Sequence, residues 1–263
     1  MVKKDALLPG EVVETFDYVI DGVKKPGKRR VLKLDIGNGV KMEFVRIEKG
    51  TFRMGASDGD TNACRDEKEP RKVELDGFYI GKYEVTQEEY KAVTGKTPFN
   101  FMGGRLPVVY VSWNDADQFC KTLSERIERK VVLPSEAQWE YACRAGTKTP
   151  YHFGAKWNPD LANNNGKGTV AVGSYLANPW GLHDMLGNVC EWCRDYYGPY
   201  DKVEVRRNPI QLDKQSDDSR VLRGGAVDDV AWDWRASCRN MGSPEGGSGL
   251  EEFVGFRVCL PLD

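Results

Sequence analysis

Residues 181–192 have the sequence GLHDMLGNVCEW, and the fold of this chain depends on how such loop-like stretches are held in place. From about residue 150 onward glycine, asparagine and proline are frequent, which predicts long loops with few regular elements. Aromatic side chains supply much of the burial in a protein rich in loops, so we expect Trp192 to be a core anchor. The other expected anchors are Trp139, Tyr141 and Trp180.

The segments before this loop region carry clear periodic patterns. Apolar and polar residues alternate over 11–20, 29–36 and 40–55, as they do in half-buried antiparallel strands. Helices are predicted at about 86–95, 112–127 and 135–146. Each begins at a hydroxyl residue with a polar partner three residues later, the first residues being Thr86, Ser112 and Ser135. Gly95 and Gly146 are the expected stop signals.

The composition favours one domain over residues 1–263, with a β-rich N-terminal extension over 1–40. The chain has 263 residues, 40% of them hydrophobic, so it can bury a sizeable core. Its formal net charge of −2 gives no electrostatic footprint for nucleic acid. No apolar stretch approaches the roughly 20 residues of a transmembrane helix, and MVKKDALLPG lacks the apolar core of a signal peptide. We expect a monomer.

The seven cysteines are an odd set, so at least one stays unpaired in a monomer. Cys120 and Cys143 fall on apolar helix faces and are expected to be buried, inert thiols. Cys190 and Cys193 have the CxxC spacing of a redox pair or of half a zinc site, although no second CxxC follows.

Eight motifs occur in one order along the chain. They are FRMG (52–55), GKYEVTQEEY (81–90), PVVYVSWNDADQFC (107–120), LPSEAQWEYACRAG (133–146), GLHDMLGNVCEW (181–192), RVLRGGA (220–226), RASCRN (235–240) and GFRV (255–258). Together they resemble the formylglycine-generating enzyme (sulfatase-modifying factor) family over about residues 40–260. The resemblance implies an α+β protein with a C-type-lectin-like fold of the formylglycine-generating-enzyme type: small antiparallel sheets, two to three helices and much ordered coil.

Glycines and arginines in these motifs have simple structural interpretations. The glycines are expected to permit unusual backbone angles, at Gly187, Gly224, Gly225 and Gly255. A planar guanidinium can satisfy several buried acceptors at once, so the arginines are expected to tie loops together, at Arg223, Arg235, Arg239 and Arg257.

The chain departs from the enzymes of this family at the catalytic position. In those enzymes the segment after the glycine pair carries two cysteines, five residues apart, that bind copper and perform the oxidation. Here Asp229 and Trp234 stand at the two positions, and residues 226–234 contain no cysteine. Copper(I) binding needs soft thiolate ligands, so the sequence predicts a protein that is not an enzyme and has no cofactor. HExxH and phosphate-binding glycine motifs are also absent from the sequence.

A second branch with this fold matches the layout better. Variable proteins of diversity-generating retroelements, one spirochaete surface protein among them, place a hypervariable segment between RGG and GFR, and residues 220–258 have this arrangement. In that system template adenines are randomised, so an AAC codon can become Asp, Val, Ser or Gly, whereas tryptophan needs a codon such as AGG. The candidate ligand-binding residues are Val227, Asp228, Asp229, Val230, Trp232, Asp233, Trp234, Ser237, Asn240, Gly246, Gly247, Glu251, Glu252 and Phe253.

Elementary physics supports a binding surface in this region. Adjacent Asp228 and Asp229 are costly to bury unpaired, and residues 228–234 fit neither the helix nor the strand period, so we expect an exposed loop. Exposed tryptophan beside carboxylates is typical of contact patches. The alternative is a solvated acidic loop with Trp232 or Trp234 folded into the core.

Residues 243–253 are the expected second half of the site. A positively charged or apolar protein is the expected partner, and a cell-surface or secreted location would suit such a binder. Two other hypotheses remain open: a divergent enzyme relative that uses Cys190 and Cys193, and an undiversified interaction subunit.

A calcium site is a further candidate. The resemblance implies calcium ligands in the GN-x-x-E-W turn, which here are Asn188, the carbonyl of Val189 and Glu191. Three oxygens are few for an ion that usually takes six to eight. The alternative is that Asn188 and Glu191 bond to the backbone of the loops.

Overall fold

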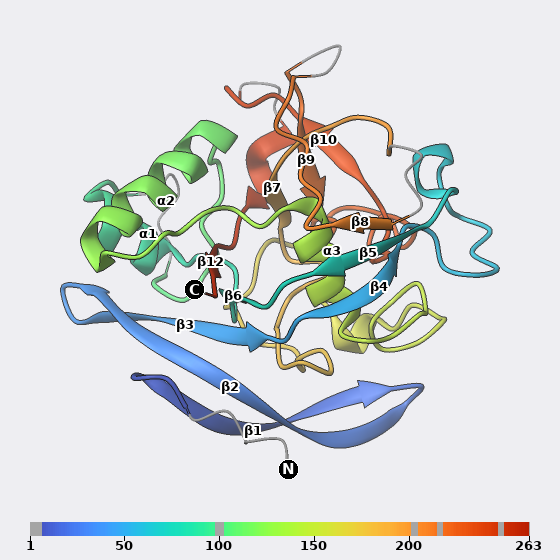
Figure 1. Cartoon of the computed structure of the whole chain (residues 1–263), viewed down its shortest axis with the longest axis horizontal. Coiled ribbons are helices and arrows are strands. Elements are labelled where there is room, and N and C mark those ends of the chain that lie inside the picture. Colours follow the sequence, from blue (N-terminus) through green and yellow to red (C-terminus); the bar gives the residue numbers. More distant parts are fainter. Residues whose placement is uncertain (1–6, 98–102, 201–204, 215–217, 247–249, 263) are drawn as a thin grey trace.

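The computed structural model describes residues 7–97, 103–200, 205–214, 218–246 and 250–262. Three small sheets and three helices account for the regular structure of this part of the chain, and the rest is ordered coil (Figure 1). The five-stranded sheet has the order β1-β2-β3-β6-β12, the four-stranded sheet β10-β9-β7-β11 and the three-stranded sheet β4-β5-β8. All described pairs are antiparallel except β11 with β7 and β5 with β8. The expected small, mostly antiparallel sheets are thus confirmed.

The strands and helices have the following bounds: β1 (Glu11–Ile20), β2 (Val23–Gly37), β3 (Val40–Ile47), β4 (Gly50–Met54), β5 (Arg71–Leu75), β6 (Phe78–Gly81), α1 (Gln87–Thr94), α2 (Trp113–Ile127), α3 (Glu136–Arg144), β7 (Cys190–Tyr196), β8 (Val205–Arg207), β9 (Arg220–Arg223), β10 (Asn240–Gly242), β11 (Val254–Gly255) and β12 (Cys259–Pro261). Short 3-10 turns occur at η1 (Arg65–Glu67), η2 (Pro159–Leu161) and η3 (Leu250–Phe253).

A long two-stranded ribbon forms the N-terminal part. β1 pairs with β2 from Glu11↔Leu32 to Ile20↔Val23, and Figure 1 shows this hairpin crossing below the rest of the molecule. β2 then continues beyond the hairpin and pairs with β3. Buried residues on this second half of β2, Val31 and Ile36, connect the ribbon to the core.

All three predicted helices are present, and their local signals explain them. Side chains of Thr86, Ser112 and Ser135 accept hydrogen bonds from the backbone three residues later, so each helix begins with the expected capping box. α1 ends at Gly95 in the left-handed conformation, as expected. α3 differs from the prediction, because Ala145 takes the left-handed cap position one residue before Gly146.

The core consists of two hydrophobic clusters on either side of β7. Cys190 and Trp192 belong to one cluster, whereas Cys193 belongs to the other. Trp139, Tyr141 and Trp192 are buried, which confirms them as anchors, while Trp180 is half-buried. The indole of Trp192 donates to the Val111 carbonyl over 2.9 Å, so the ring also fixes a loop.

β12 completes the five-stranded sheet by pairing with β6, from Cys259↔Ile80 to Pro261↔Phe78. Beside it, the guanidinium of Arg257 donates to the Gly81 carbonyl over 3.0 Å and to both carboxylate oxygens of Glu191 over 2.6 and 2.7 Å. The C-terminal strands therefore hold β6 and β7 together. Among the described helices, none has the length and apolar character needed to cross a membrane.

Candidate functional site

The segment after the glycine pair, residues 224–240, forms a series of turns between β9 and β10. Gly225 has φ +71°, and a Cβ added there would lie 2.4 Å from the Trp234 ring, so glycine is required where the segment leaves β9. Gly255 is different from the expectation, because its φ is not positive. Its small size matters instead: a Cβ there would lie 2.6 Å from the Val108 carbonyl oxygen.

Arg235 anchors the segment in the interior. Its guanidinium donates to Glu67 over 2.6 and 2.8 Å and to Asp60 over 2.9 Å, and its Nε donates to the Trp232 carbonyl over 2.7 Å. Burial raises the pKa of Glu67, but the hydrogen bonds from Arg235 outweigh it and hold that pKa below its usual value. One side chain thus ties the segment to the turn at η1, as expected for these arginines.

Trp234 is a second anchor. Its indole donates to the Ala226 carbonyl over 2.7 Å and stacks on Trp157 at 4.4 Å between ring centroids. Its side chain is only 3% exposed, so the expectation that residues 228–234 form an exposed loop is wrong at this position. The physical reason is tertiary packing. The Trp157 ring and the Ala226 carbonyl surround Trp234, and no sequence pattern indicates these two contacts.

Val227 and Ser237 are also buried, with no solvent-exposed surface. The Val227 amide donates to the Asn188 carbonyl over 3.2 Å, which turns this residue inward immediately after the glycine pair. Ser237 lies beside Arg235, whose guanidinium donates to its hydroxyl over 3.3 Å. Neither side chain is part of the outer surface, contrary to the expectation from the sequence.

Other predicted residues do face solvent. Asp228, Val230, Trp232 and Asn240 are exposed, and Trp232 leaves 53% of its surface in water. Met241, on β10 beside Asn240, is exposed as well. We use the name display face for these five residues.

Asp229 and Asp233 are half-buried and turn toward two thiols. The Asp229 carboxylate accepts from the Ala226 amide over 2.6 Å and from the Cys190 thiol over 3.8 Å, and Asp233 accepts from the Cys238 thiol over 3.8 Å. The four residues line a cavity of about 10 Å³, the room of a single water molecule. Burial raises the pKa of the Cys238 thiol to about 12 and that of Cys190 well above its usual value, so both stay protonated at neutral pH.

The described part of residues 243–253, the expected second half of the site, lies near Cys190 and the Asp229 turn. β11 pairs with β7 at Val254↔Cys190, so η3 and the Asp229 turn both lie next to Cys190. Glu252 is exposed, Phe253 and Gly246 are half-buried, while Gly247 and the side chain of Glu251 lie outside the described residues. The two predicted segments are therefore neighbours.

Tyr110 is a surface residue that sequence reasoning missed. It is exposed and has φ +55°, a strained conformation for a bulky residue. Desolvation raises its pKa, and a hydrogen bond with Glu252 raises it further. No sequence pattern marks Tyr110 as a surface residue.

The calcium candidate does not fit the contacts of its residues. Glu191 accepts from Arg257 with both oxygens and from the Trp139 indole over 2.9 Å, so a guanidinium already occupies the place of a cation. The Asn188 amide is fully used, and its oxygen accepts from Val170 and Asn163 over 3.0 Å. The Val189 amide donates to Glu84. Asn188 thus bonds to loop backbone, as the alternative interpretation has it, whereas Glu191 bonds to the side chains of Arg257 and Trp139.

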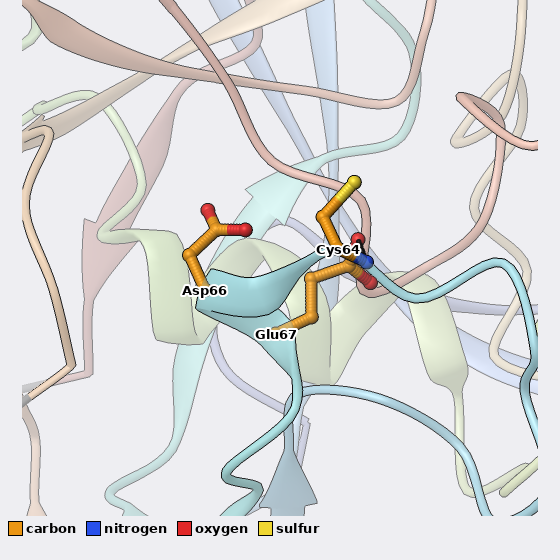
Figure 2. A group of neighbouring side chains, drawn as sticks. All are labelled: Cys64, Asp66 and Glu67. Carbon is orange, nitrogen blue, oxygen red and sulfur yellow. Dashed lines mark hydrogen bonds between the residues drawn. The ribbon is translucent and has the colours of Figure 1, made fainter.

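Figure 2 shows another group of potential ligands, Cys64, Asp66 and Glu67, which extend from the single turn of η1. Both oxygens of Glu67 accept from Arg235, while Asp66 accepts from the Tyr197 hydroxyl over 2.7 Å. Burial and the nearby Glu67 raise the pKa of the Cys64 thiol, which disfavours the thiolate that a metal requires. This group is part of the anchor of Arg235.

Cys190 and Cys193 do not form a redox pair. Both lie on β7, where side chains three residues apart face opposite sides of a strand, and they belong to different core clusters. Burial raises the pKa of both thiols well above the usual value. The CxxC spacing is thus a coincidence of the strand sequence. Cys120 and Cys143 are buried, as expected.

Comparison with known proteins agrees with this geometry. A profile of the family described as "Sulfatase-modifying factor enzyme 1-like domain" matches residues 37–261. The serine/threonine-protein kinase pkn1 of Chlamydia pneumoniae is 32% identical over 250 residues, which cover 84% of this chain but 38% of the kinase. The formylglycine-generating enzyme of Mus musculus is 26% identical over 290 residues, 82% of this chain and 74% of the enzyme. The chain thus spans well under half the length of its kinase relative.

Two solved structures share the fold. PvdO from Pseudomonas aeruginosa superposes with a TM-score of 0.78 and 27% identity, over 91% of this chain and all of that one. Treponema denticola variable protein 1 superposes with a TM-score of 0.76 and 24% identity, over 88% of this chain and 98% of that one. Both confirm the expected C-type-lectin-like fold of the formylglycine-generating-enzyme type.

Proposed function

The chain belongs to the sulfatase-modifying factor enzyme 1-like family, and we propose that it is a non-catalytic member that binds a protein ligand through its display face. One observation carries the proposal: Trp232, half exposed, lies two residues before the buried Trp234 and three before the buried Arg235. In a binding site, a rigid aromatic ring held at the surface gives contact area at little entropic cost.

The display face is held rigid from both sides. The Trp232 carbonyl accepts from the buried Arg235, and the Ala231 carbonyl accepts from the Tyr151 hydroxyl over 3.0 Å. The backbone around the exposed ring is therefore fixed before any ligand arrives. Such preorganisation lowers the entropy that binding must overcome.

The charges of the surface indicate the partner. Asp228 and Glu252 are exposed carboxylates, and Val230 and Trp232 supply exposed apolar area. A protein surface with basic and apolar groups complements this combination. Together with the neighbouring Glu252, the display face is thus suited to a protein partner with basic or apolar groups.

A non-catalytic role agrees with the chemistry around the displaced catalytic positions. Where the enzymes of the family carry copper-binding cysteines, this chain has Asp229 and the buried Trp234. The nearby thiols of Cys190 and Cys238 are kept protonated by burial. A protonated thiol is a poor copper ligand and a poor nucleophile.

The test is the DNA sequence around the codons of residues 220–258 and the neighbouring kilobases. We further propose that this face is diversified by a retroelement, which requires a nearby reverse transcriptase and a template repeat that differs from the gene at adenines alone. We expect the differing codons to be those of Asp228, Val230, Trp232 and Asn240, and the codons of the buried Val227 and Ser237 to be unchanged. A template whose differences fall on the buried codons, or the absence of any template, overturns the diversified-binder proposal.

A divergent oxidase is the competing function, because Cys190 and Cys238 line one cavity. Its test is copper-dependent oxidation of a cysteine-containing peptide by the purified protein. Our proposal predicts no turnover above that of the Cys190→Ser/Cys238→Ser variant. Turnover that this double variant loses would favour the oxidase.

A further inference from the structure

A cavity of about 310 Å³ opens between β4 and the C-terminal end of α3, and it shares no lining residue with the display face. Three aromatic side chains form its wall: Phe52, Tyr141 and Trp180. The ring centroids of Phe52 and Tyr141 are 5.2 Å apart, and those of Tyr141 and Trp180 are 4.6 Å apart in an edge-to-face arrangement. The wall is therefore a continuous aromatic surface.

Trp180 is held in place by the loop that carries it. The buried Asn178 accepts from the Trp180 amide over 3.0 Å and donates to the Ala142 carbonyl of α3 over 2.7 Å. The carbonyl of the next residue, Gly181, accepts a hydrogen bond from Arg29. The backbone that carries the half-buried indole is thus fixed on both sides of Trp180.

A second cavity of about 400 Å³ adjoins the first, because Tyr141 and Trp180 line both. Its remaining lining is strongly basic and comprises Val13, Lys28, Arg29, Arg30, Arg46, Ile47 and Glu48. Arg29 pairs with Glu14 and Arg46 with Glu48, both over 3.1 Å, while Lys28 is exposed at the opening. The first cavity thus combines the aromatic wall with the basic side chains of Arg53, Arg144 and Lys148, and its neighbour adds more positive charge beside the same rings.

We propose that the two cavities together bind a small molecule that carries a planar aromatic ring and a carboxylate. The ring lies against Trp180 and Tyr141, and the carboxylate points toward Lys28 in the basic cavity. The volumes match those of small-molecule sites, which are usually apolar with a few polar groups that fix orientation. This site is independent of the proposed function of the display face.

The probe for the test is 2-naphthoate, with the neutral 2-naphthamide of the same shape as its comparison, titrated by calorimetry into the whole chain. We expect 2-naphthoate to bind at least tenfold more tightly than the amide and to lose affinity as salt rises. Trp180→Ala is expected to weaken binding by roughly thirtyfold, as loss of a central aromatic contact does. Equal affinity for the two probes overturns the assignment of a carboxylate site.

Charge variants keep the test decisive if Trp180→Ala disturbs folding. Lys28→Glu changes an exposed side chain and is expected to weaken 2-naphthoate binding roughly tenfold. Lys25→Glu is the matched control, because Lys25 is exposed on the same strand but does not line the cavity. Trp232→Ala is expected to leave 2-naphthoate binding unchanged. Loss of binding in Trp232→Ala, or equal effects of the two lysine variants, overturns the site.

Discussion

Residues 228–233 and residues 234–238 are consecutive parts of one irregular loop, yet the first is exposed or half-buried throughout and the second is buried throughout. Their tryptophans illustrate the difference. Trp232 is 53% exposed and Trp234 is 3% exposed, although a single residue separates them. The difference lies in distant partners, since Trp157 and the Ala226 carbonyl receive Trp234.

Buried side chains anchor this loop only because residues far away in the sequence supply their partners. Arg235 needs Glu67 and Asp60, and Arg239 needs Glu136, to which it donates over 2.6 and 3.0 Å. An exposed residue such as Trp232 needs no side-chain partner of this kind, because it is sufficient that its backbone is fixed. Substitutions in residues 228–233 should therefore change binding, while those in 234–238 should change stability.

The largest effect is expected for Arg235→Met. Methionine leaves the buried Glu67 carboxylate without its cation, which typically costs about 3–5 kcal/mol in the free energy of unfolding. Denaturant unfolding followed by circular dichroism measures the loss. Arg53→Met is the matched control, because its 2.6 Å pair with Asp58 is exposed, and we expect less than about 1 kcal/mol. Equal losses in the two variants would contradict the anchor role of Arg235.

A smaller loss is expected for Trp234→Phe. Phenylalanine keeps an aromatic ring on Trp157 but removes the donor to Ala226 and part of the buried area, for a loss of about 2 kcal/mol. Trp232→Phe, the same change two residues earlier, should leave the free energy of unfolding nearly unchanged. Similar losses for the two variants would erase the distinction between the two regions.

Lowering the pH should reduce the free energy of unfolding, because the buried His152 is held in its neutral form. This histidine lies beside Pro150, whose carbonyl accepts from the Ala236 amide over 2.7 Å. Burial, with a smaller effect from His183, lowers the pKa of His152 from 6.5 to about 3. The unfolded chain therefore takes up a proton below pH 6.5 that the folded chain takes up only near pH 3, and the stability contributed at neutral pH is lost as pH falls through this window.

The expected loss is about 1.4 kcal/mol for each pH unit below 6.5. His152→Gln removes the titrating group, so the wild type should lose stability relative to this variant between pH 6.5 and 4.5. Chemical denaturation at several pH values measures the difference between the two slopes. Parallel curves for wild type and variant would show that His152 is not held neutral.

The smallest effect on stability is expected for Trp232→Ala. Because the ring is half exposed, its loss should change the free energy of unfolding by less than about 0.5 kcal/mol, as for most surface substitutions. A destabilisation of more than about 2 kcal/mol would instead assign Trp232 to the core. The expected outcome sharpens the comparison, since Trp234→Phe is a more conservative change with a larger effect.

The helices and the inner strands could be predicted because their signals are local. Capping partners lie three residues apart at Thr86, Ser112 and Ser135, and strand alternation spans a few residues. The display face could be predicted in part, since Asp228 and Trp232 are indeed at the surface. These predictions needed no knowledge of distant residues.

The remaining features depend on long-range contacts. Val227 turns inward because its amide meets Asn188, and Ser237 because it lies beside Arg235 in the interior. Tyr110 likewise contacts Glu252, a residue far away from it in the chain. Periodicity carries no information about such partners, and only the folded arrangement reveals them.

The pairing of β12 with β6 also sets an order of events during synthesis. β6 leaves the ribosome long before Arg257 and β12, which hold it to β7, have been translated. Until then one edge of β6 has no strand partner. This apolar strand is therefore open to pairing with strands of other chains. The five-stranded sheet is therefore complete only after residues 254–261 have been translated.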